Sequence, residues 1–126
     1  MIFMIFESKI IKGLGKGKEL GYPTVNLEIP KDFKYEFGIY KGFIWFGEKK
    51  KLSAVFFGHR VTMGVMGETL EFYVIDWEKG DEKEVSEAKK VKFEIGNFIR
   101  ESRKFESEEE LKKQIEEDVE RVRTFI

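Results

Sequence analysis

The chain has 126 residues, of which 41% are hydrophobic and 15% are aromatic, so we expect a single domain over residues 1–126 with a substantial core. Charged residues make up 37% of the chain but leave a net charge of only −1. This balance argues against broad attraction to nucleic acid or to an anionic membrane surface. The chain has no Cys and a single His, His59, which excludes disulfides, thiolate chemistry and multi-histidine metal sites.

The opening residues, MIFMIF, are apolar, but they are too few to span a membrane. They also lack the basic flank and the small-residue cleavage site of a signal peptide. We therefore expect a first strand over residues 2–11, broken at Glu7-Ser8-Lys9. We also expect a cytoplasmic, monomeric protein with no membrane partner.

The middle of the chain reads as a series of strands separated by charged turns. The turns are expected at 47–51 and at 78–83, and His59 is most simply a loop residue. The strands are predicted at 25–29, 38–46, 52–57, 69–77 and 90–99.

The end of the chain has a helical pattern. Ser107 and Glu110 form a capping box, in which the Ser hydroxyl accepts from the backbone three residues on and Glu110 reaches back. An apolar stripe follows on one helical face, made of Leu111, Ile115, Val119 and Val122. The expected fold is therefore a closed or nearly closed antiparallel sheet of about six strands with one C-terminal helix. We expect the helix to cover one opening of the barrel.

A glycine-rich loop separates the first two predicted strands. Its glycines allow positive φ and let backbone N–H groups approach an anion closely, while two lysines add charge. The loop is neither a phosphate-binding Walker loop nor a dinucleotide fingerprint, because no Gly-Lys-Ser/Thr opens a helix and no helical pattern follows. A flexible turn between strands is the alternative. The residues concerned are Gly13, Gly15, Lys16, Gly17, Lys18 and Gly21.

Two side chains after this loop could hold a hard cation. Pro23 stiffens the exit from the loop, and Thr24 and Asn26 are two residues apart, so on a strand they share a face. Both offer neutral oxygen to an ion such as Mg²⁺, provided that nucleotide phosphates and waters complete its coordination shell. The alternative is that both side chains make local turn hydrogen bonds.

The stretch GKGKELGYPTVNL, residues 15–27, resembles the signature of the riboflavin kinase family of bacterial and eukaryotic type. That signature is Gly-x-Gly-Arg-x-Leu-Gly-Phe-Pro-Thr-Ala-Asn-Leu, so Lys18 stands for Arg and Val25 for Ala. Four further blocks are similar to the family in the right order: 38–40, 58–62, 70–77, and 98–118 with its Arg-x-x-x-Lys-Phe and Leu-x-x-Gln-Ile-x-x-Asp. The family's Asp-Phe…Leu-Tyr-Gly segment is not recognisable between Asp76 and Lys92, which we expect to lie near a substrate-side loop.

The resemblance implies a six-stranded antiparallel Greek-key β-barrel with a C-terminal α-helix. It implies a stand-alone kinase domain that transfers the γ-phosphoryl of ATP to the ribityl 5′-hydroxyl of riboflavin, giving FMN and ADP. Thr24 and Asn26 would contact the phosphates and Mg²⁺, or Mn²⁺ or Zn²⁺ in its place. The glycine loop through Pro23 would bind the nucleotide.

Glu71 would be the base that takes the hydroxyl proton. Its chain neighbours are apolar, so it could sit at a barrel wall beside a pocket, where its pKa could rise. The alternative is an exposed position on an alternating strand. Arg100 and Phe105 would line the flavin site, although a capping or salt-bridge role for Arg100 is equally open.

Two other functions are possible alternatives for this sequence. The first is a non-catalytic barrel that binds flavin or nucleotide. The second is a small barrel that binds single-stranded nucleic acid through lysines and aromatics, which the near-neutral charge disfavours. The donor, ATP or instead CTP or GTP, is not specified by a loop whose backbone contacts only phosphate.

Overall fold

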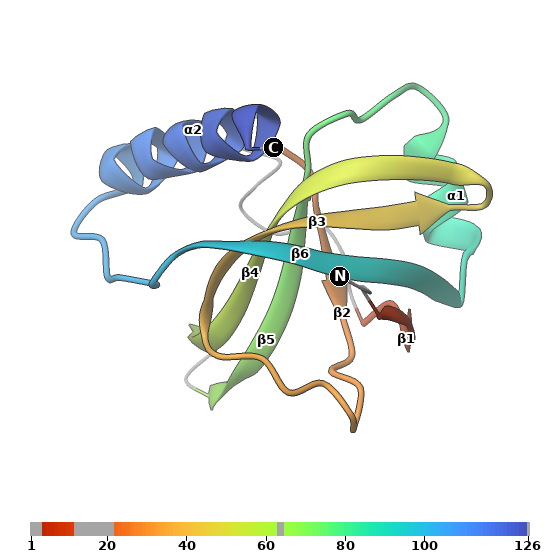
Figure 1. The fold of residues 1–126 in the computed structure, drawn as a ribbon, viewed down its shortest axis with the longest axis horizontal. Helices are drawn as coiled ribbons and strands as arrows, with labels where there is room; N and C mark the ends of the chain where they lie inside the picture. The colour runs from red at the N-terminus through yellow and green to blue at the C-terminus, as the bar shows by residue number, and fades with distance from the viewer. Residues whose placement is uncertain (1–3, 12–21, 63–64, 126) are drawn as a thin grey trace.

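A computed structural model describes residues 4–11, 22–62 and 65–125 of the chain. Within these residues, six strands and two helices follow one another (Figure 1). They are β1 Ile5–Lys9, β2 Thr24–Leu27, β3 Gly38–Phe46, β4 Lys49–Thr62, β5 Val65–Val74, α1 Asp81–Glu87, β6 Lys90–Arg100 and α2 Glu108–Thr124.

All six strands belong to one antiparallel sheet with the order β1-β6-β3-β4-β5-β2. The two edge strands meet where Ile10 forms an isolated bridge with Leu27. Beside this bridge the Glu28 N–H donates to the Lys9 carbonyl at 2.9 Å. The sheet therefore curls into the antiparallel barrel that the alternating pattern predicted, and this prediction is confirmed.

Alternation along the strands divides the core in two. The barrel interior is filled by fully buried side chains such as Val55, Phe72 and Phe93. The residues next to them in sequence point outward, and Ala54 and Tyr73 join Ile39 in a second apolar cluster on the outer surface. The barrel thus presents an apolar patch on its outside, which needs a cover.

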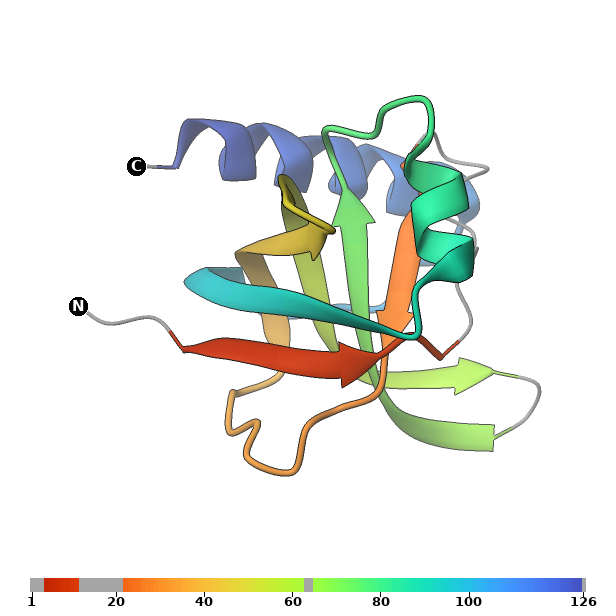
Figure 2. The same ribbon diagram turned by 90° about the vertical axis from the view of Figure 1, so that its right-hand side faces the viewer.

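Helix α2 provides this cover, so the expectation that it lies over a barrel opening is wrong. Its apolar stripe packs on the outer cluster, and the helix runs across one side of the sheet (Figure 2). Arg121 donates to the carbonyl of Ile99 at 3.1 Å, and Lys41 donates to the carbonyl of Phe125 at 2.7 Å. Val85 and Ala88, at the end of α1, pack instead against the interior cluster.

Helix α1 begins inside the segment predicted as a charged turn at 78–83, so that prediction holds only for the residues before Asp81. The reason is a buried carboxylate: Asp81 is fully buried and accepts from Lys49 at 2.9 Å and from the Glu78 N–H at 2.8 Å. Lys51, which is also buried, approaches it at 3.1 Å. Burial alone would raise the pKa of Asp81, but these hydrogen bonds outweigh it and lower that pKa.

Several strand boundaries differ from the prediction. Strand β1 is not broken at residues 7–9, because Ser8 is buried and its hydroxyl donates to the Glu28 carbonyl. Strand β4 begins earlier and ends later than 52–57, so His59 lies in a strand, with its ring against Phe37. Strand β5 ends at Val74 rather than at residue 77.

The C-terminal helix begins where the sequence predicted. Ser107 accepts from the Glu110 N–H at 3.2 Å. The other half of the predicted box differs, because the Glu110 carboxylate accepts from the N–H of Glu106 at 3.2 Å. Within the described residues, no helix has both the length and the apolar composition needed to cross a membrane.

Candidate functional site

A row of polar side chains lies on the outer face of the barrel where β2 pairs with β5. Asn26 is the direct register partner of Glu71, and Thr24 is the partner of Tyr73. The intervening residues of β2, Val25 among them, fill the barrel interior, so Thr24 and Asn26 share the outer face. The pairing brings the predicted cation-binding side chains together with the predicted base.

This row is covered despite its position on the outer face. Thr24 is 1% exposed and Glu71 is 5% exposed, so Glu71 is not the exposed strand position that was the alternative. The Oδ1 atom of Asn26 is buried and has no hydrogen-bond partner in the part of the chain that the structure describes. A buried carbonyl oxygen without a partner is costly, and a cation or a hydrogen-bond donor bound there would satisfy it.

The donor set of the row fits a hard cation that phosphate oxygens help to hold. Asn26 supplies a buried neutral oxygen and Thr24 a hydroxyl two residues away. Among residues 4–11, 22–62 and 65–125, no group of three or more His, Asp or Glu side chains could hold a metal by itself. Two neutral oxygens hold a bare cation weakly, so a cation here would need phosphate oxygens and water to complete its coordination shell.

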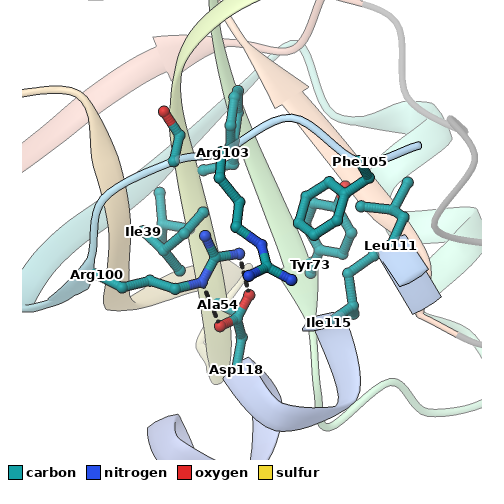
Figure 3. A pocket seen from close by; sticks show the side chains of 12 residues that line it. Ile39, Ala54, Tyr73, Arg100, Arg103, Phe105, Leu111, Ile115 and Asp118 are labelled. Carbon is teal, nitrogen blue, oxygen red and sulfur yellow. Dashed lines mark hydrogen bonds and ion pairs between the residues drawn. The ribbon is translucent and has the colours of Figure 1, made fainter. Parts of the chain in front are cut away.

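An apolar pocket adjoins the row (Figure 3). Tyr73 belongs to both, because it pairs with Thr24 in the ladder and lines the pocket wall. The pocket lies between the outer face of the barrel and α2, and about 410 Å³ of space in and in front of it, open solvent included, is free of protein atoms. Its lining consists of Ile39, Ala54, Val55, Phe56, Tyr73, Arg100, Ser102, Arg103, Phe105, Leu111, Ile115 and Asp118.

Arg100 and Phe105, the predicted flavin-binding residues, both lie in this lining. Arg100 also forms a salt bridge, donating to the two carboxylate oxygens of Asp118 at 2.8 and 2.7 Å. The salt-bridge role left open for Arg100 is thus observed, and its contact with the flavin stays a prediction. The guanidinium of Arg103 lies 5.0 Å from the ring centre of Phe105 (Figure 3).

The predicted nucleotide-binding residues of the glycine loop, from Gly13 to Gly21, lie outside the described residues. Pro23 is described, and its carbonyl accepts from the Val74 N–H at 3.0 Å, which fixes the start of β2 against β5. The divergent segment between residues 76 and 92 contributes no residue to the lining of the pocket. It forms the α1 end of the barrel instead, so the expectation that it lies near a substrate-side loop is not supported by this pocket.

Sequence reasoning missed two features of this region. Thr69 lies on the same face of β5 as Glu71, and its Oγ1 is buried without a hydrogen-bond partner among the described residues. Asp118 anchors Arg100 and accepts from Gln114 at 3.1 Å. The spacing of Gln114 and Asp118, one helical turn apart, was visible in the sequence, but their partner on β6 was not.

Comparisons with known proteins agree with this architecture. The chain superimposes on a solved structure of a macrolide-efflux protein from Streptococcus pneumoniae with a TM-score of 0.79 and 22% sequence identity. The match covers 98% of this chain and 40% of that one, and at this identity it shows the fold alone. The chain is 30% identical over 116 residues to the RNA-binding riboflavin kinase RibR of Bacillus subtilis (strain 168). That match covers 91% of this chain and 48% of the relative, so the chain spans about half of the relative's length.

A family model described as Flavokinase: Riboflavin kinase matches residues 3–126. The chain therefore belongs to the riboflavin kinase family.

Proposed function

We propose that this protein is a riboflavin kinase, which transfers the γ-phosphoryl group of ATP to the 5′-hydroxyl of the ribityl chain of riboflavin. Membership of the family supports this class of reaction. One observation carries the assignment of the site. Asn26 and Glu71 are register partners on a covered face of the barrel, two residues along the ladder from the Thr24–Tyr73 pair that leads into an apolar pocket.

The pocket suits the flavin ring system. Its walls are aromatic and aliphatic, and Tyr73 and Phe105 offer flat surfaces (Figure 3). Arg100 and Arg103 supply cationic groups at the same wall. A ring system in this pocket would direct its ribityl chain past Tyr73 towards Glu71.

Glu71 is the base in this proposal. The ribityl oxygen attacks the γ-phosphorus, the bond between the γ-phosphorus and the bridging oxygen to the β-phosphate breaks, and ADP leaves with the electron pair. The hydroxyl proton passes to the Glu71 carboxylate and from there to solvent. Such a transfer depends mainly on positioning and on neutralising charge, and a positioned base contributes roughly 10²–10⁴-fold.

Thr24 and Asn26 would hold Mg²⁺, or Mn²⁺ or Zn²⁺ in its place, together with phosphate oxygens. The buried and unpartnered Oδ1 of Asn26 supports this assignment. When bound, the cation would neutralise charge on the phosphates. Thr24 and Asn26 would hold it next to Glu71, because all three side chains stand on two paired strands.

The test is a product assay with purified protein, riboflavin, ATP and Mg²⁺, in which the flavins are separated by chromatography. We expect FMN from the wild type. Glu71→Gln should reduce turnover at least 100-fold and spare riboflavin binding, and Thr24→Ala should raise the Mg²⁺ requirement. Glu68→Gln, an exposed carboxylate three residues away on β5, is the matched control and should keep full activity.

If no FMN forms with ATP, the assay is repeated with CTP and GTP. Failure with all three donors, combined with tight binding of riboflavin or nucleotide, would contradict the kinase and favour a non-catalytic barrel. Full activity of Glu71→Gln would leave the reaction in place but overturn the assignment of the base.

A further inference from the structure

Strand β3 carries two aromatic side chains, Phe43 and Trp45, on the outer face of the barrel. Their chain neighbours Ile44 and Phe46 fill the interior, so the two rings point outward. Among the described residues, both rings lie outside the interior cluster and outside the apolar cluster that packs under α2. Two large rings about 7 Å apart along one strand, and outside both clusters, mark an interaction surface rather than a part of the core.

Lysine side chains lie over these rings. The Nζ of Lys50 is 4.2 Å from the ring centre of Phe43 and 5.4 Å from that of Trp45. The Nζ of Lys41 is 5.9 Å from the ring centre of Phe43, and exposed Lys92 is the register partner of Trp45 on β6. These five residues form the lysine–aromatic patch. Because the stems of Lys side chains are flexible, their ammonium groups can leave the rings when an anion binds.

The near-neutral total charge does not describe this part of the molecule. Helices α1 and α2 hold 11 of the 24 acidic residues but only 5 of the 23 basic residues. The rest of the chain therefore holds 13 acidic and 18 basic residues. Two carboxylates adjoin the patch: Glu94, which is 16% exposed and lies 4.0 Å from Lys50, and Glu7, the register partner of Lys92. The three lysines of the patch outnumber them, so this face attracts anions.

We propose that the lysine–aromatic patch binds single-stranded nucleic acid. Two unpaired bases would stack on Phe43 and Trp45, and the lysines would move from the rings to the backbone phosphates. An acidic peptide would satisfy the lysines but not both flat rings, and a duplex keeps its bases stacked on one another. The contacts involve only phosphates and ring faces, so binding should tolerate any base sequence and either sugar.

This inference does not rest on the proposed function. The patch is built by β3, β4 and β6, whereas the Asn26–Glu71 pair stands on β2 and β5. Removing a ring of the patch should therefore leave FMN formation unchanged, and failure of the kinase would leave the patch as proposed.

The experiment titrates the protein into fluorescein-labelled oligouridine of about ten nucleotides and follows fluorescence anisotropy at several salt concentrations. The wild type should bind, and Phe43→Ala should weaken binding about tenfold because one stacked base is lost. Lys50→Gln and Lys92→Gln should each lower the slope of log affinity against log salt by about 0.7. Oligothymidine of the same length should bind within about threefold of oligouridine.

Trp45 reports stacking directly. The other tryptophan of the chain, Trp77, packs edge-on against Phe46 beside the interior cluster. Unlabelled oligouridine should therefore quench the fluorescence of the wild type, and the quenching should disappear in Trp45→Phe, which keeps an aromatic ring at the position.

Two variants are matched controls: Lys112→Gln removes an exposed lysine from α2, and Phe98→Ala removes an exposed ring outside the patch. Both should keep the wild-type affinity for oligouridine. Thermal unfolding should give equal melting temperatures for Phe43→Ala and the wild type, because the ring lies outside both clusters. Absence of binding by the wild type, or equal affinity of Phe43→Ala and the wild type, would overturn the inference. So would self-association of the wild type that Phe43→Ala abolishes and oligouridine does not affect, because the patch would then join two copies of the chain.

Discussion

Arg100 and Asp118 join the last strand of the barrel to the C-terminal helix through two parallel hydrogen bonds of 2.8 and 2.7 Å. The side chain of Asp118 is 5% exposed and that of Arg100 is 17% exposed, so water screens the pair only weakly. The same two residues line the pocket. The pair therefore fixes the helix and one wall of the pocket at once.

We expect Asp118→Asn to destabilise the protein by roughly 2 kcal/mol, because one charge-assisted hydrogen bond is lost and an amide N–H₂ then faces the guanidinium. The midpoint of urea unfolding measures this change. The control is Glu117→Gln, an exposed carboxylate one residue earlier, which should unfold with the wild-type midpoint. Equal midpoints for Asp118→Asn and the wild type would show that the pair contributes no net stability.

The carboxylate of Asp81 should make stability depend on acidic pH. Because its pKa is lowered in the folded state, its contribution is fully present above the ordinary value of 3.8. That contribution is lost as the pH falls through the lower folded value, where the carboxylate takes up a proton. We expect Asp81→Asn to cost roughly 3 kcal/mol at pH 7, since it leaves buried Lys51 short of a partner.

The measurement is urea unfolding of the wild type and Asp81→Asn across the range from pH 7 to below pH 3.8. The gap between the two proteins should narrow as the pH falls below 3.8. Glu87→Gln, at an exposed position of the same helix, is the control. A gap that stays constant with pH would mean that the loss in Asp81→Asn comes from packing rather than from charge.

Gly42 allows the centre of the barrel to pack. A Cβ at this position would meet the Cγ2 of Val55 at 2.5 Å and the Glu94 carbonyl oxygen at 2.9 Å. Gly42→Ala should therefore destabilise the fold by about 1–3 kcal/mol. Gly67→Ala is the matched control on β5, because nothing lies within 4 Å of the added carbon there. Thermal unfolding of both variants gives the comparison, and equal melting temperatures would refute the crowding at Gly42.

Phe105 should contribute to binding of the acceptor but not of the donor. Its ring lines the pocket under the guanidinium of Arg103. We expect Phe105→Ala to weaken riboflavin binding about tenfold through the loss of apolar contact, and to leave MgADP affinity unchanged. Quenching of riboflavin fluorescence measures the first quantity. Phe98→Ala, whose ring is 45% exposed and outside the lining, is the control. A loss of MgADP affinity alone would place the donor, not the acceptor, in this pocket.

Much of the fold followed from the sequence because apolar and polar residues alternate along parts of several strands. In β6, buried Val91, Phe93 and Ile95 alternate with more exposed neighbours, and this pattern needs no long-range information. The capping residue Ser107 likewise marks the start of α2 with local chemistry alone.

The parts that the sequence did not reveal depend on contacts between distant residues. From the local sequence, the α1 segment looks like a charged turn. The local sequence does not show that Lys49 and Lys51, about 30 positions earlier in the chain, neutralise Asp81. The place of α2 depended on an outer apolar cluster that exists only once β3, β4 and β5 are side by side. In the candidate site, the spacing of Thr24 and Asn26 was local, but the pairing of Asn26 with Glu71 is a register between strands.

The polar residues of the site are held by strand pairing, whereas the outer wall of the pocket is made of loop and helix residues, and this difference affects how such a protein can change during evolution. Asn26 and Glu71 are held by strand pairing, so an inserted or deleted residue in β2 would turn one of them into the barrel interior. The outer wall of the pocket comes from residues 102–105 and from one side of α2, which no ladder constrains. We expect homologues to diversify in that wall while the polar ladder stays unchanged, so that new acceptors arise without rebuilding the reaction centre.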